Sequence, residues 1–193
     1  MLKDLIKANR SCRGYDRSRR VTKKELTEMV DCARLSAAGI NLQVLKYYIT
    51  NDREEAAKLN ELTKLGAMLP ELKLPFKGEE PPAYILICQD LDISDKEDHF
   101  LMDVGIAAQS ITLAATEMGL AACMIGNYSQ VKVHEAMGLA PNLRVKLIIA
   151  VGKSAETAKI VRVPASGLTA YYRNDKGEHC VPKRSLKDVL ITK

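Results

Sequence analysis

Hydrophobic positions recur at spacings of three and four residues in several stretches of the chain, which is the pattern of helices with one buried face. Thr22 stands three residues before Glu25, the spacing of a helix-capping box, and apolar residues follow at helical intervals. The pattern predicts helices over residues 2–8, 23–36, 52–62 and 129–137.

A longer and more apolar helix is predicted further along the chain. Ser94 and Glu97 have capping-box spacing, and from Phe100 onward apolar residues occupy almost every face of the helix. Polar residues interrupt the most apolar stretch, 106–124, so a buried helix is favoured over a membrane span. A helix that is apolar all round belongs at the centre of a fold or at a large subunit interface. Gly119 is placed to end it.

Runs rich in β-branched and aliphatic residues predict four strands, over residues 44–50, 83–88, 121–125 and 143–151. The second run is almost continuously apolar, which indicates a strand buried on both faces. Few strands among long helices predict an α+β layer arrangement and not a regular doubly wound sheet. The length of 193 residues predicts a single domain over 1–193.

Composition narrows the function classes. Apolar residues make up 47% and charged residues 27%, which is ordinary for a soluble globular protein. The net charge is +5, but there is no tryptophan and no basic stripe interleaved with aromatics, so no nucleic-acid partner is expected. The N-terminus carries no apolar signal segment, which makes a cytoplasmic protein without a membrane partner the expectation.

Cysteines and histidines give little support to metal or thiol chemistry. The five cysteines form no C-x-x-C pair and their number is odd, which argues against a disulfide framework or a zinc site. The three histidines are scattered, so no metal is expected. Cys180 follows His179, but adjacent side chains of an extended segment point to opposite faces, which weakens a catalytic pair.

Two short basic clusters lie at the two ends of the chain, Arg10-Ser11-Cys12-Arg13 and Lys183-Arg184-Ser185. Guanidinium groups pair with phosphate oxygens in a bidentate manner, and a serine hydroxyl adds a neutral donor. If the fold brings the ends together, they form one anion clamp. Taken alone, each cluster is better explained as a solvated helix end or a charged tail than as a binding site. Neither a P-loop nor a G-x-G-x-x-G motif is present, which disfavours a classical Rossmann dehydrogenase.

Four stretches in order along the chain resemble the FMN-dependent nitroreductase family. The N-terminal cluster is similar to the family's Arg-Arg-Ser-x-Arg opening, and residues 36–43 resemble its Pro-Ser-x-x-Asn-x-Gln-Pro loop. Residues 103–126 and 181–186 match two further family segments. Each match alone is weak, but four in order over nearly the whole chain are specific.

The resemblance implies an α+β sandwich in which a mainly antiparallel sheet is flanked by helices. It also implies a domain-swapped homodimer with two FMN molecules at the interface. The long apolar helix would be the central dimer helix. Residues 64–82, which are rich in proline and glycine, would form a variable flap, and residues 168–193 a C-terminal extension over the partner.

The family's motifs also assign roles to residues of this chain. Positions 10–13 would hold the FMN phosphate, ribityl chain and pyrimidine edge, and 183–184 would add phosphate contacts. The loop at 37–43 would reach the isoalloxazine from the other subunit, and 124–126 would lie against the ring. The implied cofactor-binding set is Arg10, Ser11, Cys12, Arg13, Ala37, Ala38, Gly39, Asn41, Gln43, Met124, Ile125, Gly126, Lys183 and Arg184.

The sequence departs from the family pattern at several of these positions. Ala37-Ala38 stands where the family usually has Pro-Ser, so one serine hydroxyl contact is missing. Val44 replaces the proline after the glutamine, and Leu45 replaces a frequent tryptophan. Cys12 is either a redox-sensitive thiol or an ordinary small packed residue.

The implied activity is hydride transfer from NADH or NADPH through flavin N5 to a nitroaromatic, quinone or related acceptor, in a ping-pong mechanism. No catalytic side chain is assigned, because the flavin carries the reaction. Another flavin reaction on the same fold, such as reductive dehalogenation or ene reduction, remains an alternative, as does a non-catalytic flavin-binding protein. The nicotinamide preference and the subunit that supplies Lys183 and Arg184 are open.

Overall fold

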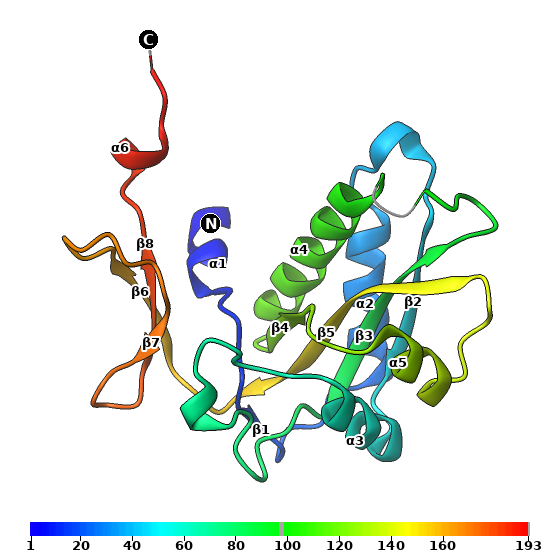
Figure 1. The fold of residues 1–193 in the computed structure, drawn as a ribbon, viewed down its shortest axis with the longest axis horizontal. Helices are drawn as coiled ribbons and strands as arrows, with labels where there is room; N and C mark the ends of the chain where they lie inside the picture. The colour runs from blue at the N-terminus through cyan, green and yellow to red at the C-terminus, as the bar shows by residue number, and fades with distance from the viewer. Residues whose placement is uncertain (97–98, 193) are drawn as a thin grey trace.

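A five-stranded antiparallel sheet forms the centre of the computed structural model, which describes residues 1–96 and 99–192 (Figure 1). The longest strand, β5 (Leu143–Ser154), pairs with β3 (Ala83–Asp90) along one side. Its other side pairs with β4 (Ala121–Ile125) and β1 (Tyr15–Asp16). Strand β2 (Leu45–Thr50) pairs with the far side of β3. This is the predicted mainly antiparallel sheet.

The register of the sheet sends alternate residues into two apolar layers. Ile85 pairs with Ile149 and faces one layer, while Leu86 pairs with Ile148 and faces the other. Strand β3 is buried from Ala83 to Gln89, which confirms the prediction of a strand covered on both faces.

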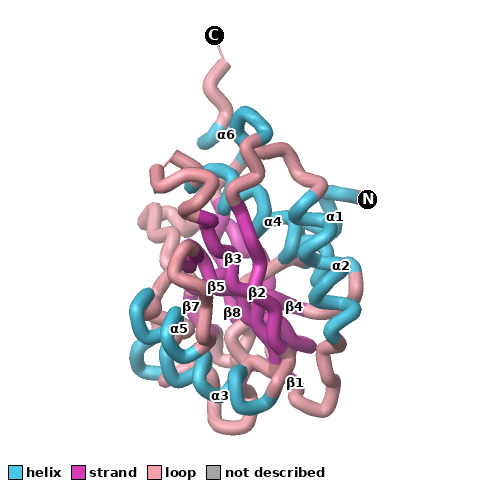
Figure 2. The backbone as a smooth tube through the Cα atoms, turned by 90° about the vertical axis from the view of Figure 1, so that its right-hand side faces the viewer, coloured by secondary structure: helices cyan, strands magenta, loops and turns pink. Residues whose placement is uncertain are grey.

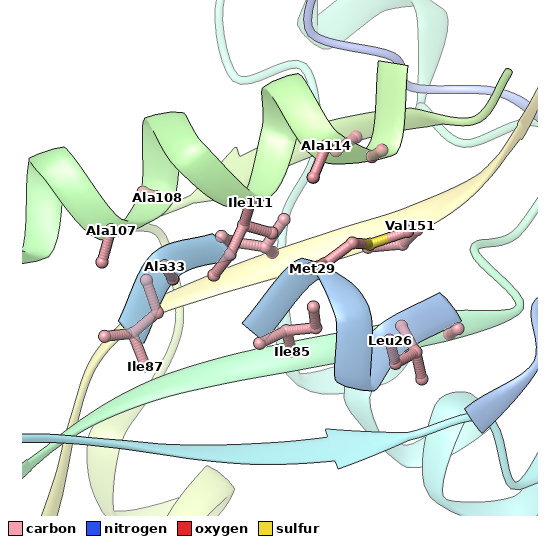
Figure 3. Close-up of a cluster of buried hydrophobic side chains, with 14 of the residues drawn as sticks. Leu26, Met29, Ala33, Ile85, Ile87, Ala107, Ala108, Ile111, Ala114 and Val151 are labelled. Carbon is pink, nitrogen blue, oxygen red and sulfur yellow. The ribbon is translucent and has the colours of Figure 1, made fainter. Parts of the chain in front are cut away.

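Helices cover both faces of the sheet, with α2 (Lys23–Arg34) and α4 (Leu101–Glu117) on one side. On the other side lie α3 (Arg53–Leu62) and α5 (Gln130–Ala136) (Figure 2). Met29 of α2 and Ile111 of α4 meet Ile85 of the sheet in the first layer (Figure 3). Burial of such side chains stabilises the fold by about 1.5–3 kcal/mol each.

The two ends of the chain add smaller elements. The N-terminal helix α1 (Leu2–Ala8) contacts α4. Beyond β5, a three-stranded sheet joins β6 (Ala158–Arg162), β8 (His179–Lys183) and β7 (Tyr172–Arg173). A final turn of helix, α6 (Leu186–Val189), follows β8. Residues 64–82 contain one short 3-10 helix, Pro70–Leu72.

Several predicted helix ends are confirmed. The Thr22 hydroxyl accepts from the backbone N–H of Glu25, whose carboxylate accepts from the backbone N–H of Thr22. The Asp52 carboxylate caps α3. Gly119 has φ +73° after α4, a left-handed conformation in which a β-carbon would be strained.

The prediction for the start of the long helix differs from the structure. Helix α4 begins at Leu101, and its N-terminal residue Phe100 makes no side-chain capping bond. The Ser94 hydroxyl instead accepts from the backbone N–H of Lys96 at 3.4 Å, and Glu97 lies outside the described residues. Strands β1, β6, β7 and β8 were not predicted, because two of them are two residues long and the others lack a continuous apolar run. Among the described helices, none has the length and apolar character needed to cross a membrane.

Candidate functional site

The N-terminal basic cluster is fixed between β4 and α4. The backbone N–H of Cys12 donates to the Ala122 carbonyl at 3.1 Å, which docks the cluster on β4. The Asn9 side chain donates to the Thr112 hydroxyl of α4 at 2.9 Å. The Tyr15 hydroxyl, fully buried, donates to the Cys12 carbonyl at 2.9 Å. The backbone at residues 9–13 is therefore held in place by hydrogen bonds from three directions.

Arg10 directs one guanidinium nitrogen at the end of α1, and the Ser11 hydroxyl lies beside Cys123. Arg10 Nη2 donates to the Ile6 carbonyl at 2.6 Å, while its Nε is buried without a hydrogen-bond partner. Burial lowers the pKa of Arg10 below its usual value. Ser11 is exposed. Both side chains keep donors available for an anion.

Cys12 is a packed residue in this structure. Its thiol is buried and donates to the Gly14 carbonyl at 3.0 Å. Burial raises the pKa of Cys12 to about 12, which suppresses the thiolate that redox chemistry requires. Of the two interpretations of this cysteine, the structure favours the packed residue.

Arg13 is buried and makes its contacts within its own chain. Its Nη1 lies 3.3 Å from the Ser11 carbonyl and 2.9 Å from His179 Nε2. Its guanidinium carbon lies 4.4 Å from the centre of the Tyr171 ring, a cation–π distance. The predicted phosphate and pyrimidine contact thus sits under the C-terminal segment, and Arg10 is the more available of the two arginines.

Around Arg13 lies a buried polar cluster that the sequence did not reveal, here named the head–tail junction. Glu156, whose side chain is 4% exposed, accepts from the Arg13 backbone N–H at 2.5 Å and forms an ion pair with Arg173. The Tyr171 ring lies 5.0 Å from the His179 ring. The junction comprises Arg13, Glu156, Tyr171, Arg173 and His179.

His179 is neutral in this cluster. Burial, followed by the positive charges of Arg13 and Arg173, lowers its pKa to about 4. A neutral imidazole can accept the Arg13 hydrogen bond at Nε2, which leaves the proton on Nδ1, a buried atom without a partner. Sequence reasoning considered His179 only beside Cys180, whose buried thiol donates to the Glu178 carbonyl at 3.7 Å. Nothing local in the sequence pairs position 13 with position 179.

The segment 124–126 lies at the end of β4, close to the N-terminal cluster. Met124 is 40% exposed, and Ile125 is buried against the sheet. A β-carbon added to Gly126 would meet no atom within 4 Å, so the backbone there is open to an approaching molecule. Burial raises the pKa of the neighbouring Cys123 to about 11, and the Arg13 charge and Ser11 hydroxyl oppose that rise. The structure therefore places positions 10–13 beside Ala122 and Cys123, directly before the predicted segment 124–126 on the same strand.

The loop at 37–43 lies at the other end of α4. The backbone N–H of Gly39 donates to Asp103 Oδ1, in the first turn of α4, at 2.9 Å. Asn9 contacts Thr112 of the same helix, so the two groups of predicted residues are separated by about 13 Å along its axis. A cavity of about 520 Å³ opens behind the loop, and its walls include Ala37, Ala38, Gln43 and Asp103.

The C-terminal basic pair forms a third group. Lys183 ends β8 and Arg184 follows it, and both are exposed. Strand β8 touches the N-terminal cluster through His179, four residues earlier. The described residues contain no group of three or more His, Cys, Asp or Glu side chains that could hold a metal ion.

Comparison with known proteins assigns the chain to a family. Residues 6–153 match the model of the nitroreductase family. The chain belongs to the nitroreductase family. It is therefore a nitroreductase-family oxidoreductase, as the four sequence stretches predicted.

Relatives of this nitroreductase-family chain cover most of its length. YodC of Bacillus subtilis, provisionally named an NAD(P)H nitroreductase, is 23% identical over 87% of this chain and 97% of its own. A nitroreductase family protein of Streptococcus pneumoniae has the same fold, with a TM-score of 0.70, 19% identity and coverage of 88% and 99%. A protein of Exiguobacterium sibiricum, solved in complex with FMN, gives a TM-score of 0.70 at 20% identity, with coverage of 89% and 97%.

Proposed function

We propose that this nitroreductase-family chain binds FMN and transfers reducing equivalents from NADH or NADPH to nitroaromatic, quinone or related acceptors. The complex of the Exiguobacterium sibiricum neighbour with FMN supports the cofactor, and the name of the Bacillus subtilis relative supports the donor. The observation that carries the proposal is the docking of the N-terminal basic cluster on β4 at Ala122 and Cys123, in the strand that leads to the open backbone at Gly126.

The residues present fit FMN at this place. Arg10 has a buried guanidinium nitrogen without a partner, and the exposed Ser11 hydroxyl lies beside it in the chain. Such donors suit a phosphate or a ribityl hydroxyl. The exposed Lys183 and Arg184 supply further positive charge. The open backbone at Gly126 suits a flat ring, because no side chain would separate the two.

The proposed active unit is a homodimer. One end of α4 carries the basic cluster and the other end carries the loop 37–43, so one chain presents two incomplete halves of a site. Near the loop end of α4 the exposed side chains are apolar, with Leu101 50%, Met102 77% and Ile106 41% exposed. A two-fold pairing along this face would cover these side chains and bring the loop of one subunit to the basic cluster of the other.

In this arrangement the side chains bind, orient and stabilise charge. FMN, if held by these residues, would supply the redox chemistry between the nicotinamide donor and the acceptor. Arg10 and Arg13 would hold its anionic groups and would favour a negatively charged form of the ring. Ala38 supplies no hydroxyl to the ring, so the loop contacts it through its backbone and through Asn41 and Gln43. No side chain is assigned as an acid or base.

The flap at 64–82 and the extension at 168–193 complete the proposed single domain. The backbone N–H of Met68 donates to the Tyr171 hydroxyl at 3.3 Å, so the flap touches the extension beside Arg13. Met68 is 61% exposed. We place the flap over the flavin, where it shapes acceptor choice.

The function is tested by anaerobic reduction of the FMN-reconstituted protein. Addition of NADH or NADPH is expected to bleach the yellow colour, and a nitroaromatic or quinone is expected to restore it. Bleaching without reoxidation by either acceptor would favour another flavin reaction, and a yellow protein that neither donor bleaches would indicate a non-catalytic flavin protein. Met68→Ala, run in the same assay, is expected to change the ratio of acceptor rates; an unchanged ratio would remove the role given to the flap.

A further inference from the structure

The loop at 39–43 holds an unusual backbone conformation. Ile40, Asn41 and Gln43 have φ values of 47°, 53° and 54°, in the left-handed region that non-glycine residues avoid. Three such residues within four positions persist only where surrounding contacts hold them. Left-handed non-glycine residues concentrate at ligand-contacting sites, so the contacts that hold this loop bear on its function.

Most of the loop's own hydrogen bonds do not anchor it to the rest of the molecule. The backbone N–H of Asn41 donates to the Ala38 carbonyl at 3.1 Å, and that of Leu42 to the Gly39 carbonyl at 3.2 Å. The Gln43 side-chain amide donates to the Asn41 carbonyl at 3.4 Å. These bonds shape the turn internally and leave its position on the fold to be set by another contact.

That contact comes from Asp103 in the first turn of α4. Its Oδ1 accepts from the Gly39 backbone N–H at 2.9 Å. Within residues 1–96 and 99–192, this is the one side-chain hydrogen bond that reaches residues 39–43 from outside the loop. The carboxylate lies against the glycine, because a β-carbon on Gly39 would be in van der Waals contact with the same oxygen at 3.4 Å.

The surroundings of Asp103 are unusual for a carboxylate. Asp103 is buried, with 7% of its surface exposed. Its second carboxylate oxygen, Oδ2, is buried without a hydrogen-bond partner. The nearby Tyr47 hydroxyl has a raised pKa, chiefly from burial and then from the Asp103 charge. Burying a carboxylate with one oxygen unpartnered is costly, so core packing alone gives no reason for an acid here. A role in holding the loop does give one.

We propose that Asp103 is a positioning residue that holds the loop at 39–43 in the conformation that contacts the flavin of the other subunit. The proposal rests on the proposed function for the identity of the ligand. Asp103 does not touch the cofactor; it acts through Gly39, which places Asn41 and Gln43. The loop's exposed residues, Ile40 at 85% and Leu42 at 38%, are then presented outward at the same end of α4.

The test compares variants at position 103 with a control on the same helix. Asp103→Ala removes the acceptor, whereas Asp103→Asn keeps a carbonyl oxygen that can receive the Gly39 N–H. Asp103→Leu fills the volume of the aspartate side chain but offers no acceptor. It replaces the alanine variant in the test if that variant does not fold. Ser110→Ala is the control, because Ser110 contacts Ser36 at 2.6 Å just before the loop and not the loop itself.

Two measurements distinguish an effect on the loop from an effect on cofactor binding. Hydrogen exchange of the segment 39–44 in the protein without FMN is expected to quicken about tenfold or more in the alanine and leucine variants. FMN binding, followed by quenching of flavin fluorescence, is expected to weaken about tenfold in the same variants. The Asn variant and the Ser110→Ala control are expected to stay within about twofold of the unmodified protein in both measurements.

Each result decides the proposal. Unchanged exchange in the variants that lack an acceptor would overturn it, because the loop would not depend on Asp103. Faster exchange with unchanged FMN affinity would overturn the link between the loop and the flavin. If the unmodified protein binds no FMN, the proposed function fails; the exchange data then still decide whether Asp103 holds the loop.

Discussion

The sheet core is fully buried and the head–tail junction is largely buried, and different interactions hold the two regions. In the core, Ile85 and Ile111 (Figure 3) belong to one apolar cluster with Ile149. In the junction, Glu156 and Arg173 form an ion pair and the Arg13 guanidinium lies over Tyr171. The core gains stability from apolar area removed from water, and the junction gains it only where its polar groups find partners.

The comparison shows why the two regions differ in what they can do. The apolar core fixes the sheet and both helix layers, but it presents no polar group that could bind a ligand. The junction joins residues 166 positions apart in the chain, Arg13 and His179, at the edge of the proposed flavin site. The contact between Arg13 and His179 fixes the position of β8 and therefore the positions of Lys183 and Arg184 at its end.

The largest loss of stability is expected from a cavity in the core. Ile149→Ala removes a fully buried side chain from the central strand and is expected to lower the free energy of unfolding by about 2–5 kcal/mol. Ile160→Ala in β6 is the matched control, because Ile160 is 42% exposed. Its cost is expected to stay within about 0.5 kcal/mol. Urea unfolding measures both, and equal losses would contradict the contrast between the core and the C-terminal sheet.

A smaller but clear loss is expected from the junction. Glu156→Gln keeps an acceptor for the Arg13 backbone N–H but removes the charge opposite Arg173, at an expected cost of about 1.5–3 kcal/mol. The same change at Glu178, which pairs with Lys159 at the surface, is expected to cost clearly less, because water and salt screen an exposed pair.

Limited proteolysis sharpens this second comparison. Cleavage within residues 163–178 is expected to quicken in the Glu156→Gln protein and to remain slow in the Glu178→Gln protein, because only the first change loosens the junction. Similar cleavage of both proteins would show that the junction does not hold the C-terminal segment.

Local patterns predicted most of the central fold. The apolar run 83–88 and the helical spacing after Thr22 each predicted which residues are buried. Both signals lie within a few neighbouring residues, because the periods of strands and helices are short. Strands β7 and β1 escaped prediction because two residues carry no period. The family was predicted from four short stretches, and the match over 6–153 confirms it.

The site was only partly predictable. The grouping of positions 10–13 with 124–126 is what the resemblance implies, but the burial of Arg13 beneath Tyr171 depends on tertiary contacts that no local pattern records. The same holds for Asp103, which sequence reasoning treated as part of a matched segment and not as the support of a loop. In both cases one charged residue meets a partner brought from a distant part of the chain.

The most direct test of the FMN site is the affinity for FMN of single-charge variants at the two basic clusters. Arg10→Ala and Arg184→Ala are each expected to raise the dissociation constant by about 10- to 100-fold, since a charge-assisted phosphate contact contributes about 1.5–3 kcal/mol. Lys7→Ala and Lys187→Ala remove exposed charges nearby and are expected to leave it within about twofold. Unchanged affinity in both arginine variants, or no FMN binding by the unmodified protein, would contradict the site.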